Sequence, residues 1–106
     1  MKRREKYIER DDLKGATHLE VSVYYSLGGT NYWSGGTTPR GYYLSVKPVT
    51  KGDRTISHVM FTGQSRLLFQ TQRFAAKQFE RAVEMAKDYE EELIAAVVEQ
   101  NKAEVA

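Results

Sequence analysis

The chain has 106 residues and a formal net charge of +2, with 41% hydrophobic and 28% charged residues. This composition is typical of one globular domain and excludes the disordered and fibrous classes of protein. The lack of cysteine excludes disulfide bonds, thiol catalysis and cysteine-ligated zinc. No apolar run approaches the roughly 20 residues that cross a bilayer, and no apolar segment follows the basic start of the chain, so we expect a cytoplasmic protein.

Charge is distributed unevenly along the sequence. Residues 15–73 contain six basic and two acidic residues, a formal charge of +4, whereas residues 88–106 contain one basic and six acidic residues, a formal charge of −5. We therefore expect one end of the molecule to be positive and the other negative. Both ordinary solvated surface charge and a pair of faces for different partners fit this pattern.

Residues 1–14 mix charges of both signs with few apolar anchors, Tyr7, Ile8 and Leu13, and Gly15 follows them. This pattern is typical of a short helix or a loose N-terminal arm, which we expect to lie outside the core. Residues 15–106 are predicted to form a single domain.

Strict alternation of apolar and polar residues predicts a strand over residues 18–27. Its apolar face comprises Leu19, Val21, Val23, Tyr25 and Leu27, and its polar face comprises His18, Glu20, Ser22, Tyr24 and Ser26. A second strand over residues 41–49 adds Tyr42, Leu44 and Val46 to the apolar face and Tyr43, Ser45 and Lys47 to the polar face. A third strand is expected at about 54–62. Residues 65–71 form a short fourth strand or an irregular connection.

One long helix is predicted over residues 72–101, where apolar and alanine residues recur at alternating spacings of three and four. The fold class is therefore α+β, with an antiparallel sheet of three to four strands packed on one C-terminal helix. A helix of about 30 residues is longer than a ten-residue strand, so the last turns of the helix should extend beyond the sheet as an overhang. We expect Leu93, Ile94 and Val97 on this overhang to join two copies as a homodimer; the alternative is a frayed end folded back on its own domain.

The connection between the first two strands, residues 28–40, is long for a hairpin and holds four of the eight glycines and the only tryptophan. Two arrangements fit: a twisted two-stranded arm with glycine kinks, or a flap with Tyr32 and Trp33 at its tip. Tyrosine, tryptophan and arginine dominate binding hot spots, so Tyr32, Trp33 and Arg40 are predicted as the contact tip. The alternative is that Trp33 folds back over the edge of the core.

Aromatic and basic residues are mixed in the strand region, which is typical of surfaces that hold single-stranded nucleic acid. Tyr24 and Tyr43 on the polar face are candidates for base stacking, although they also fit a simple cross-strand pair. Lys47, Lys51 and Arg54 are candidates for electrostatic attachment.

No catalytic or metal-binding set can be assembled from the sequence. His18 and His58 both fall within predicted strands without the spacing of metal ligands, and residues 90–92 are carboxylates on a helix, where consecutive side chains point in different directions. No nucleophile, base and orienting group come together. We therefore expect a protein that is not an enzyme and that has no metal or cofactor.

Two segments carry a family resemblance: residues 21–33, which include the run YYSLGG, and residues 39–49, which include RGYYLSV. This hairpin resembles a group of small uncharacterised proteins carried by phages, plasmids and conjugative elements of gut bacteria, over about 30 residues. Some small proteins of such elements are anti-CRISPR inhibitors that bind a type II CRISPR nuclease or its guide RNA complex, so the resemblance implies such a setting. The strand–helix layout is also similar in topology to the single-stranded DNA-binding coactivator fold.

Together these features favour a non-enzymatic binding protein of a mobile genetic element. The first hypothesis is an anti-defence inhibitor that occludes a nucleic-acid-handling nuclease. The second is a module that binds single-stranded nucleic acid through its aromatic and basic sheet face, and a third is a purely structural homodimer.

Overall fold

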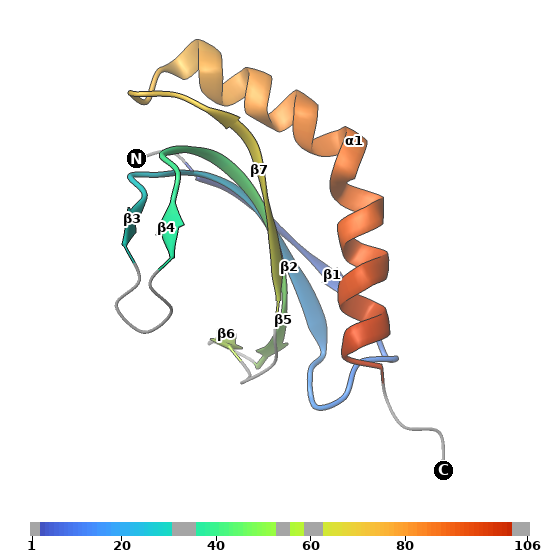
Figure 1. Ribbon diagram of the computed structural model, residues 1–106. Coiled ribbons are helices and arrows are strands. Elements are labelled where there is room, and N and C mark those ends of the chain that lie inside the picture. Colours follow the sequence, from blue (N-terminus) through green and yellow to red (C-terminus); the bar gives the residue numbers. More distant parts are fainter. Residues whose placement is uncertain (1–2, 31–35, 53–55, 59–62, 103–106) are drawn as a thin grey trace.

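The computed structural model describes residues 3–30, 36–52, 56–58 and 63–102 of the chain (Figure 1). Within these residues, seven strands precede one helix: β1 (Arg3–Glu9), β2 (His18–Ser26), β3 (Gly29–Thr30), β4 (Thr37–Thr38), β5 (Gly41–Lys51), β6 (Ile56–His58), β7 (Gln64–Gln70) and α1 (Ala76–Gln100). Five of the strands form one antiparallel sheet in the order β1-β2-β5-β6, with β7 also paired to β5. The predicted α+β fold, an antiparallel sheet packed on one long C-terminal helix, is confirmed.

The N-terminal segment is a strand, so the prediction of a short helix or a loose arm is wrong. Residues 3–9 pair with β2 along the whole length of β1, and Leu13 in the following loop is buried in the core. The period of two is present in the sequence, with Arg4, Lys6 and Ile8 on one face and Glu5 and Tyr7 on the other. This period does not appear as an alternation of apolar and polar residues, because an edge strand carries charged residues on both faces.

The core lies between the sheet and α1, where the predicted alternation is confirmed. The inward residues of β2 and β5 are Leu19, Val21, Val23, Tyr25, Tyr42, Leu44 and Val46, and all are buried. Leu27 is an exception: it follows the end of β2 and is 60% exposed, so its assignment to the apolar face is wrong.

The helix begins four residues later than predicted because the chain is still extended at Ala75. There the hydroxyl of Tyr42 accepts a hydrogen bond from the Ala75 N–H (3.4 Å) and donates one to its carbonyl (3.2 Å). At the other end the side-chain amide of Asn101 donates to the carbonyl of Val97 at 2.9 Å. Both ends of α1 are therefore held by side chains.

The expected overhang of the helix is wrong. Leu93 and Val97 are buried in the core of their own chain, and Ile94 packs against the same core. The Lys14 N–H donates to the carbonyl of Asn101 at 2.8 Å, so the loop between β1 and β2 reaches the last turn of α1. The end of α1 packs on its own domain, as the alternative expected, but it stays helical to Gln100 and neither frays nor folds back. The reason given for a homodimer therefore falls away.

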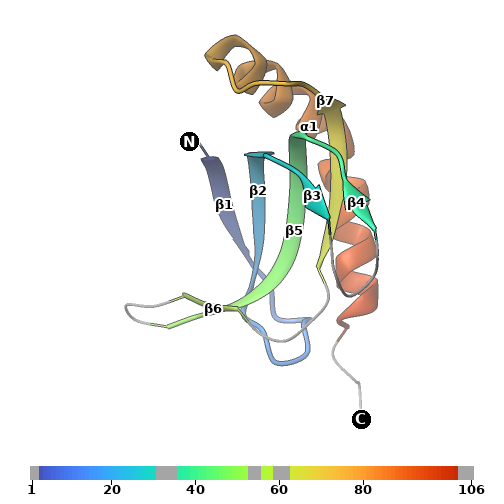
Figure 2. The ribbon, with the colours of Figure 1, turned by 60° about the vertical axis from the view of Figure 1, so that its left-hand side comes forward.

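The sheet is strongly bent, and α1 follows its convex side (Figure 1). The β3–β4 hairpin and β6 project on the concave side from opposite ends of the sheet, as the second view also shows (Figure 2). The bend is accompanied by a β-bulge, where the pairing of β5 with β7 shifts register between Tyr42 and Tyr43. A Cβ atom at Gly41 would overlap the carbonyl oxygen of Phe69, so only glycine allows the two strands this approach.

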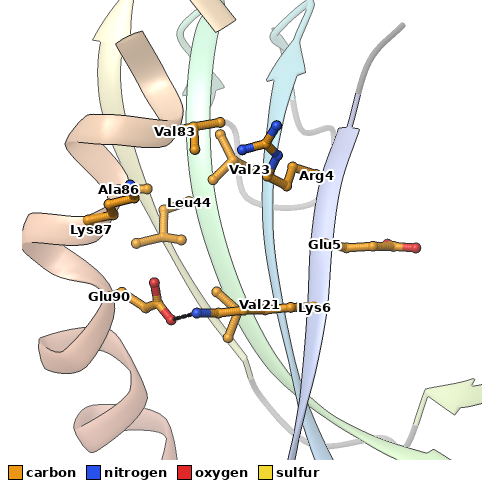
Figure 3. Close-up of a pocket in the computed structure, with 10 residues that line it drawn as sticks. All are labelled: Arg4, Glu5, Lys6, Val21, Val23, Leu44, Val83, Ala86, Lys87 and Glu90. Carbon is orange, nitrogen blue, oxygen red and sulfur yellow. Dashed lines mark ion pairs between the residues drawn. The ribbon is translucent and has the colours of Figure 1, made fainter. Parts of the chain in front are cut away.

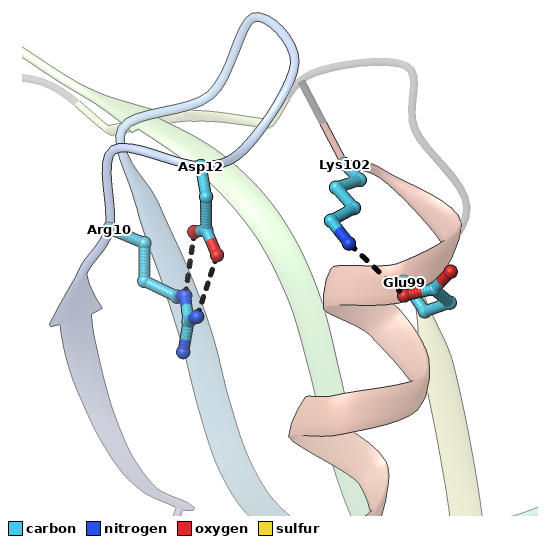
Figure 4. Close-up of polar contacts among 4 residues, drawn as sticks. All are labelled: Arg10, Asp12, Glu99 and Lys102. Atoms are coloured by element: carbon cyan, nitrogen blue, oxygen red, sulfur yellow. Dashed lines mark hydrogen bonds and ion pairs between the residues drawn. The ribbon is translucent and has the colours of Figure 1, made fainter. Parts of the chain in front are cut away.

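The corner after β1 is held by an ion pair whose effect on stability should depend on pH (Figure 4). The Arg10 guanidinium donates to both carboxylate oxygens of Asp12, at 2.8 and 2.7 Å. This hydrogen bonding holds the pKa of Asp12 below its ordinary value. A carboxyl with a lowered folded pKa stabilises the protein above its unfolded pKa, about 3.9, and this contribution is lost as the pH falls through the folded value.

We therefore expect Asp12→Asn to lower the melting temperature slightly at pH 7 and to leave it unchanged relative to the parent near pH 2. Thermal unfolding followed by circular dichroism at both pH values measures this. Asp11→Asn is the matched control, because Asp11 is an exposed neighbour outside this pair. Equal losses in both variants at pH 7 would contradict the assignment.

Candidate functional site

The concave side of the sheet carries the polar residues of three adjacent strands, which we call the concave face. The register makes neighbours of Tyr7, Glu20 and Lys47 across β1, β2 and β5, and of Tyr24 and Tyr43 across β2 and β5. The concave face comprises Glu5, Tyr7, Glu9, His18, Glu20, Ser22, Tyr24, Ser26, Tyr43, Ser45 and Lys47. The sequence pattern predicted the β2 and β5 members and missed those of β1.

The centre of the concave face is a charged cluster. The Glu20 side chain is buried, receives a hydrogen bond from the Tyr7 hydroxyl at 3.2 Å, and lies 3.5 Å from the Lys47 ammonium. Burial, followed by the charge of Glu20, raises the pKa of Tyr7. The Lys51 ammonium lies 5.5 Å from the centre of the Tyr7 ring. The carboxylate of Glu20 thus offsets the positive charge of Lys47.

A tyrosine pair lies on the concave face four residues along β2 and β5 from Glu20 and Lys47. The rings of Tyr24 and Tyr43 are stacked, with centroids 6.0 Å apart and planes inclined by 20°. Tyr43 is only 8% exposed, and its hydroxyl donates to the carbonyl of Pro39 at 2.7 Å. Burial, and to a lesser degree Tyr24, raises the pKa of Tyr43. Glu20, Ser22 and Tyr43 of the predicted polar face are buried, so this face is only partly open.

The long connection between β2 and β5 begins and ends as a two-stranded arm, in agreement with the first of the two predicted arrangements. β3 and β4 pair through Gly29–Thr38 and Thr30–Thr37. Gly28 has a positive φ of 74°, and a Cβ atom there would press on the carbonyl oxygen of Thr38. Only glycine therefore fits the turn from β2 into the arm.

Arg40 lies at the base of this arm and not at its tip. Its guanidinium donates to the carbonyls of Leu27 at 3.3 Å and Gln72 at 3.4 Å. It thereby connects the end of β2 with the segment that precedes α1. Tyr32 and Trp33, predicted for the tip, and Arg54, predicted for electrostatic attachment, lie outside the described residues.

The structure thus brings Tyr24, Tyr43 and Lys47 together on one face, and it places Lys51 at the end of that face near Tyr7. His18 is half-buried at the start of β2, where its Nδ1 lies 2.8 Å from the Thr17 hydroxyl. Within the described residues, no group of three or more histidine and acidic side chains is arranged to hold a metal ion.

The hydroxyl of Tyr43 at the base of the arm is expected to contribute to stability. Tyr43→Phe should destabilise the protein by about 1 kcal/mol, because it removes the hydrogen bond to Pro39 in a buried setting. Chemical denaturation measures this loss. Tyr24→Phe is the matched control, because it keeps the ring stack and leaves the Tyr43–Pro39 bond intact. A Tyr43→Phe variant as stable as the parent would show that the arm does not depend on this bond.

Comparison with known proteins found no matching family model, no matching curated protein and no matching solved structure. Among the described residues, α1 is too polar to qualify as a helix that crosses a membrane.

Proposed function

We propose that this protein is a non-enzymatic binding protein of a mobile genetic element, which inhibits a nucleic-acid-handling nuclease by occluding it or its guide RNA complex. A type II CRISPR nuclease in the cytoplasm of the host is the partner we expect. The observation that carries the proposal is the acidic end of α1, which we define as the exposed carboxylates Asp88, Glu91, Glu92 and Glu99.

The acidic end of α1 has the charge that a basic protein surface attracts. From residue 88 to residue 100 the helix contains no lysine or arginine. Glu92 and Glu99 have cations at 3.7 and 3.8 Å, whereas Asp88 and Glu91 form no ion pair with the described residues. Nucleases and guide RNA complexes present basic surfaces to nucleic acid, and complementary charge accelerates and orients association.

The arm supplies the second argument for a protein partner. It projects from one end of the concave side, and its base is held by Tyr43 and Arg40 (Figure 2). The segment between its two strands contains Tyr32 and Trp33. A firmly based arm that carries large aromatic residues is suited to insertion into a pocket of another molecule.

Direct binding of single-stranded nucleic acid is less well supported. Stacking needs exposed aromatic faces beside an uncompensated basic groove. Tyr43 is buried, and the carboxylate of Glu20 lies beside Lys47. Among the described residues of the concave face, the stacking and the attachment sites are thus already occupied by contacts within the chain.

A gel shift with labelled single strands at two salt concentrations, run beside size-exclusion chromatography with a guide-loaded type II nuclease, separates the two functions. The proposal predicts a stable complex with the nuclease and no shift of free strands. Tight, salt-sensitive binding to free strands would instead support the nucleic-acid module. Light scattering on the free protein tests the homodimer, which stays a prediction.

The acidic end of α1 can be tested by charge reversal. Asp88→Lys combined with Glu91→Lys should weaken binding to the nuclease at least about tenfold, mainly through slower association, because two exposed carboxylates become cations. The matched control is Glu9→Lys with Asp11→Lys, which changes the net charge equally at exposed positions of β1 and of the loop that follows it. Surface plasmon resonance measures both. If both double variants weakened binding equally, net charge alone would explain the result, and the proposed contact would be contradicted.

A further inference from the structure

A groove lies on the helix side of the sheet, between the edge strand β1 and α1 (Figure 3). Its volume is about 300 Å³. The floor and inner wall are apolar and are formed by Val21, Val23, Leu44, Val83 and Ala86. The groove exists because one helix is too narrow to cover every strand: α1 contacts β2, β5 and β7 and leaves the β1 side of the sheet less covered.

The mouth of the groove is lined mainly by cations. Arg4 and Lys6 extend from β1 over the valines of the floor, and Glu5 points away from the groove (Figure 3). Lys87 lies on the opposite side of the groove, on α1. Among the described residues that line the groove, Glu90 is the one carboxylate contributed by α1, and it forms an ion pair with Lys6. The charged side chains of this lining that face the groove are thus three cations and one anion.

The two ends of the mouth differ in how firmly they are closed. The Lys6–Glu90 pair is a close contact, and the Glu90 side chain is largely buried. The Arg4 guanidinium lies 4.0 Å from Glu80, and both of these side chains are well exposed. Exposed pairs at such distances contribute little, so Arg4 can exchange Glu80 for another anion at small cost. Of the described residues, Glu84 on the same helix is the one that pairs with Lys87, and this pair is exposed as well.

We propose that this groove binds a single alkyl chain that ends in a carboxylate. The carboxylate would lie between Arg4 and Lys87, and the chain would lie on the apolar floor toward Lys6. A slim chain fits better than a protein side chain, because no floor residue is more than 7% exposed and the apolar surface is recessed beneath the stems of Arg4 and Lys6. The volume is at the lower limit of small-molecule sites. This inference does not depend on the proposed function.

Titration of the ¹⁵N-labelled protein with octanoate, decanoate and dodecanoate, each below its micelle concentration, tests the site by nuclear magnetic resonance. The amide signals of residues 4–6 and 83–90 should shift, and those of β3 and β4 should not. Affinity should rise about tenfold for every two methylenes added until the groove is full. Decyltrimethylammonium, which has an alkyl chain of similar length to that of decanoate and a cationic head, should bind at least about tenfold more weakly, because its head would meet Arg4 and Lys87.

Two variants and one control complete the test. Ala86→Phe should abolish binding of decanoate by filling the groove. Lys87→Glu, at an exposed position, should fold normally and weaken binding at least about fivefold. Lys77→Glu makes the same change at an exposed lysine of α1 outside the groove and should have no effect. The site is disproved if decanoate causes no saturable shifts, if the shifts lie elsewhere, if the cationic amphiphile binds equally well, or if Lys77→Glu and Lys87→Glu act alike.

Discussion

Replacement of Tyr42 by alanine is expected to destabilise the protein by about 4 kcal/mol, the typical cost of removing a large buried ring. Tyr42 is fully buried at the point where β5, β7 and the start of α1 meet. Its ring contacts four other aromatic rings, those of Tyr25, Phe69, Phe74 and Phe79, with centroids 5.1 to 6.2 Å away. The substitution removes these contacts and leaves a cavity that the rigid sheet cannot close.

The same substitution also frees the start of the helix. Ala75 has no side chain that can cap α1, and the Tyr42 hydroxyl bonds to both backbone groups of Ala75. Tyr42→Phe separates this contribution from that of the ring and should cost about 1 kcal/mol. Urea denaturation of both variants, followed by circular dichroism, measures the two losses. A Tyr42→Ala variant within 1 kcal/mol of Tyr42→Phe would show that the aromatic cluster contributes little to stability.

Lys47→Met is expected to destabilise the protein by about 3 kcal/mol, because it removes the ammonium that lies 3.5 Å from the buried carboxylate of Glu20. Methionine matches the length of the lysine stem, so packing against the sheet changes little. The hydrogen bond from Tyr7 remains and cannot replace a full positive charge. Chemical denaturation at neutral pH measures this loss.

A second substitution distinguishes a lost ion pair from lost packing. Glu20→Gln in the Lys47→Met background removes the buried negative charge that faced the lysine and should recover most of the stability, because replacing both partners of a buried pair is often close to neutral. The double-mutant cycle then gives the coupling between the two residues. A double variant no more stable than Lys47→Met would mean that the lysine acts through its packing alone.

The prediction of binding residues used the alternation of side chains between the two faces of each strand. This alternation can be read from neighbouring residues in the sequence. It correctly placed Tyr24, Tyr43 and Lys47 on one face. Alternation cannot show how deeply a face is covered, because burial depends on segments distant in sequence. Tyr43 was accordingly expected to be exposed, and Arg40 was expected at the tip of the arm, whereas it bonds to Leu27 and Gln72 at the base.

Several features of this protein follow from its sequence alone. The period-two pattern of β2 and β5 and the spacing of apolar residues along α1 determine the α+β class, because strands and helices must bury one face or one stripe. The concentration of carboxylates after residue 88 determines which end of the helix is acidic. These properties depend on neighbours within a few residues, so they can be read without a tertiary structure.

Other features were decided only by tertiary structure. The charged segment of residues 3–9 becomes a strand because the free edge of β2 offers hydrogen bonds to its backbone. The last turns of α1 lie on the sheet and not beyond it: the loop between β1 and β2 reaches Asn101, and Leu93 and Val97 are buried in the core. The groove beside β1 exists because one helix cannot cover the whole sheet. Each outcome depends on contacts between segments far apart in the chain, which a local pattern does not encode.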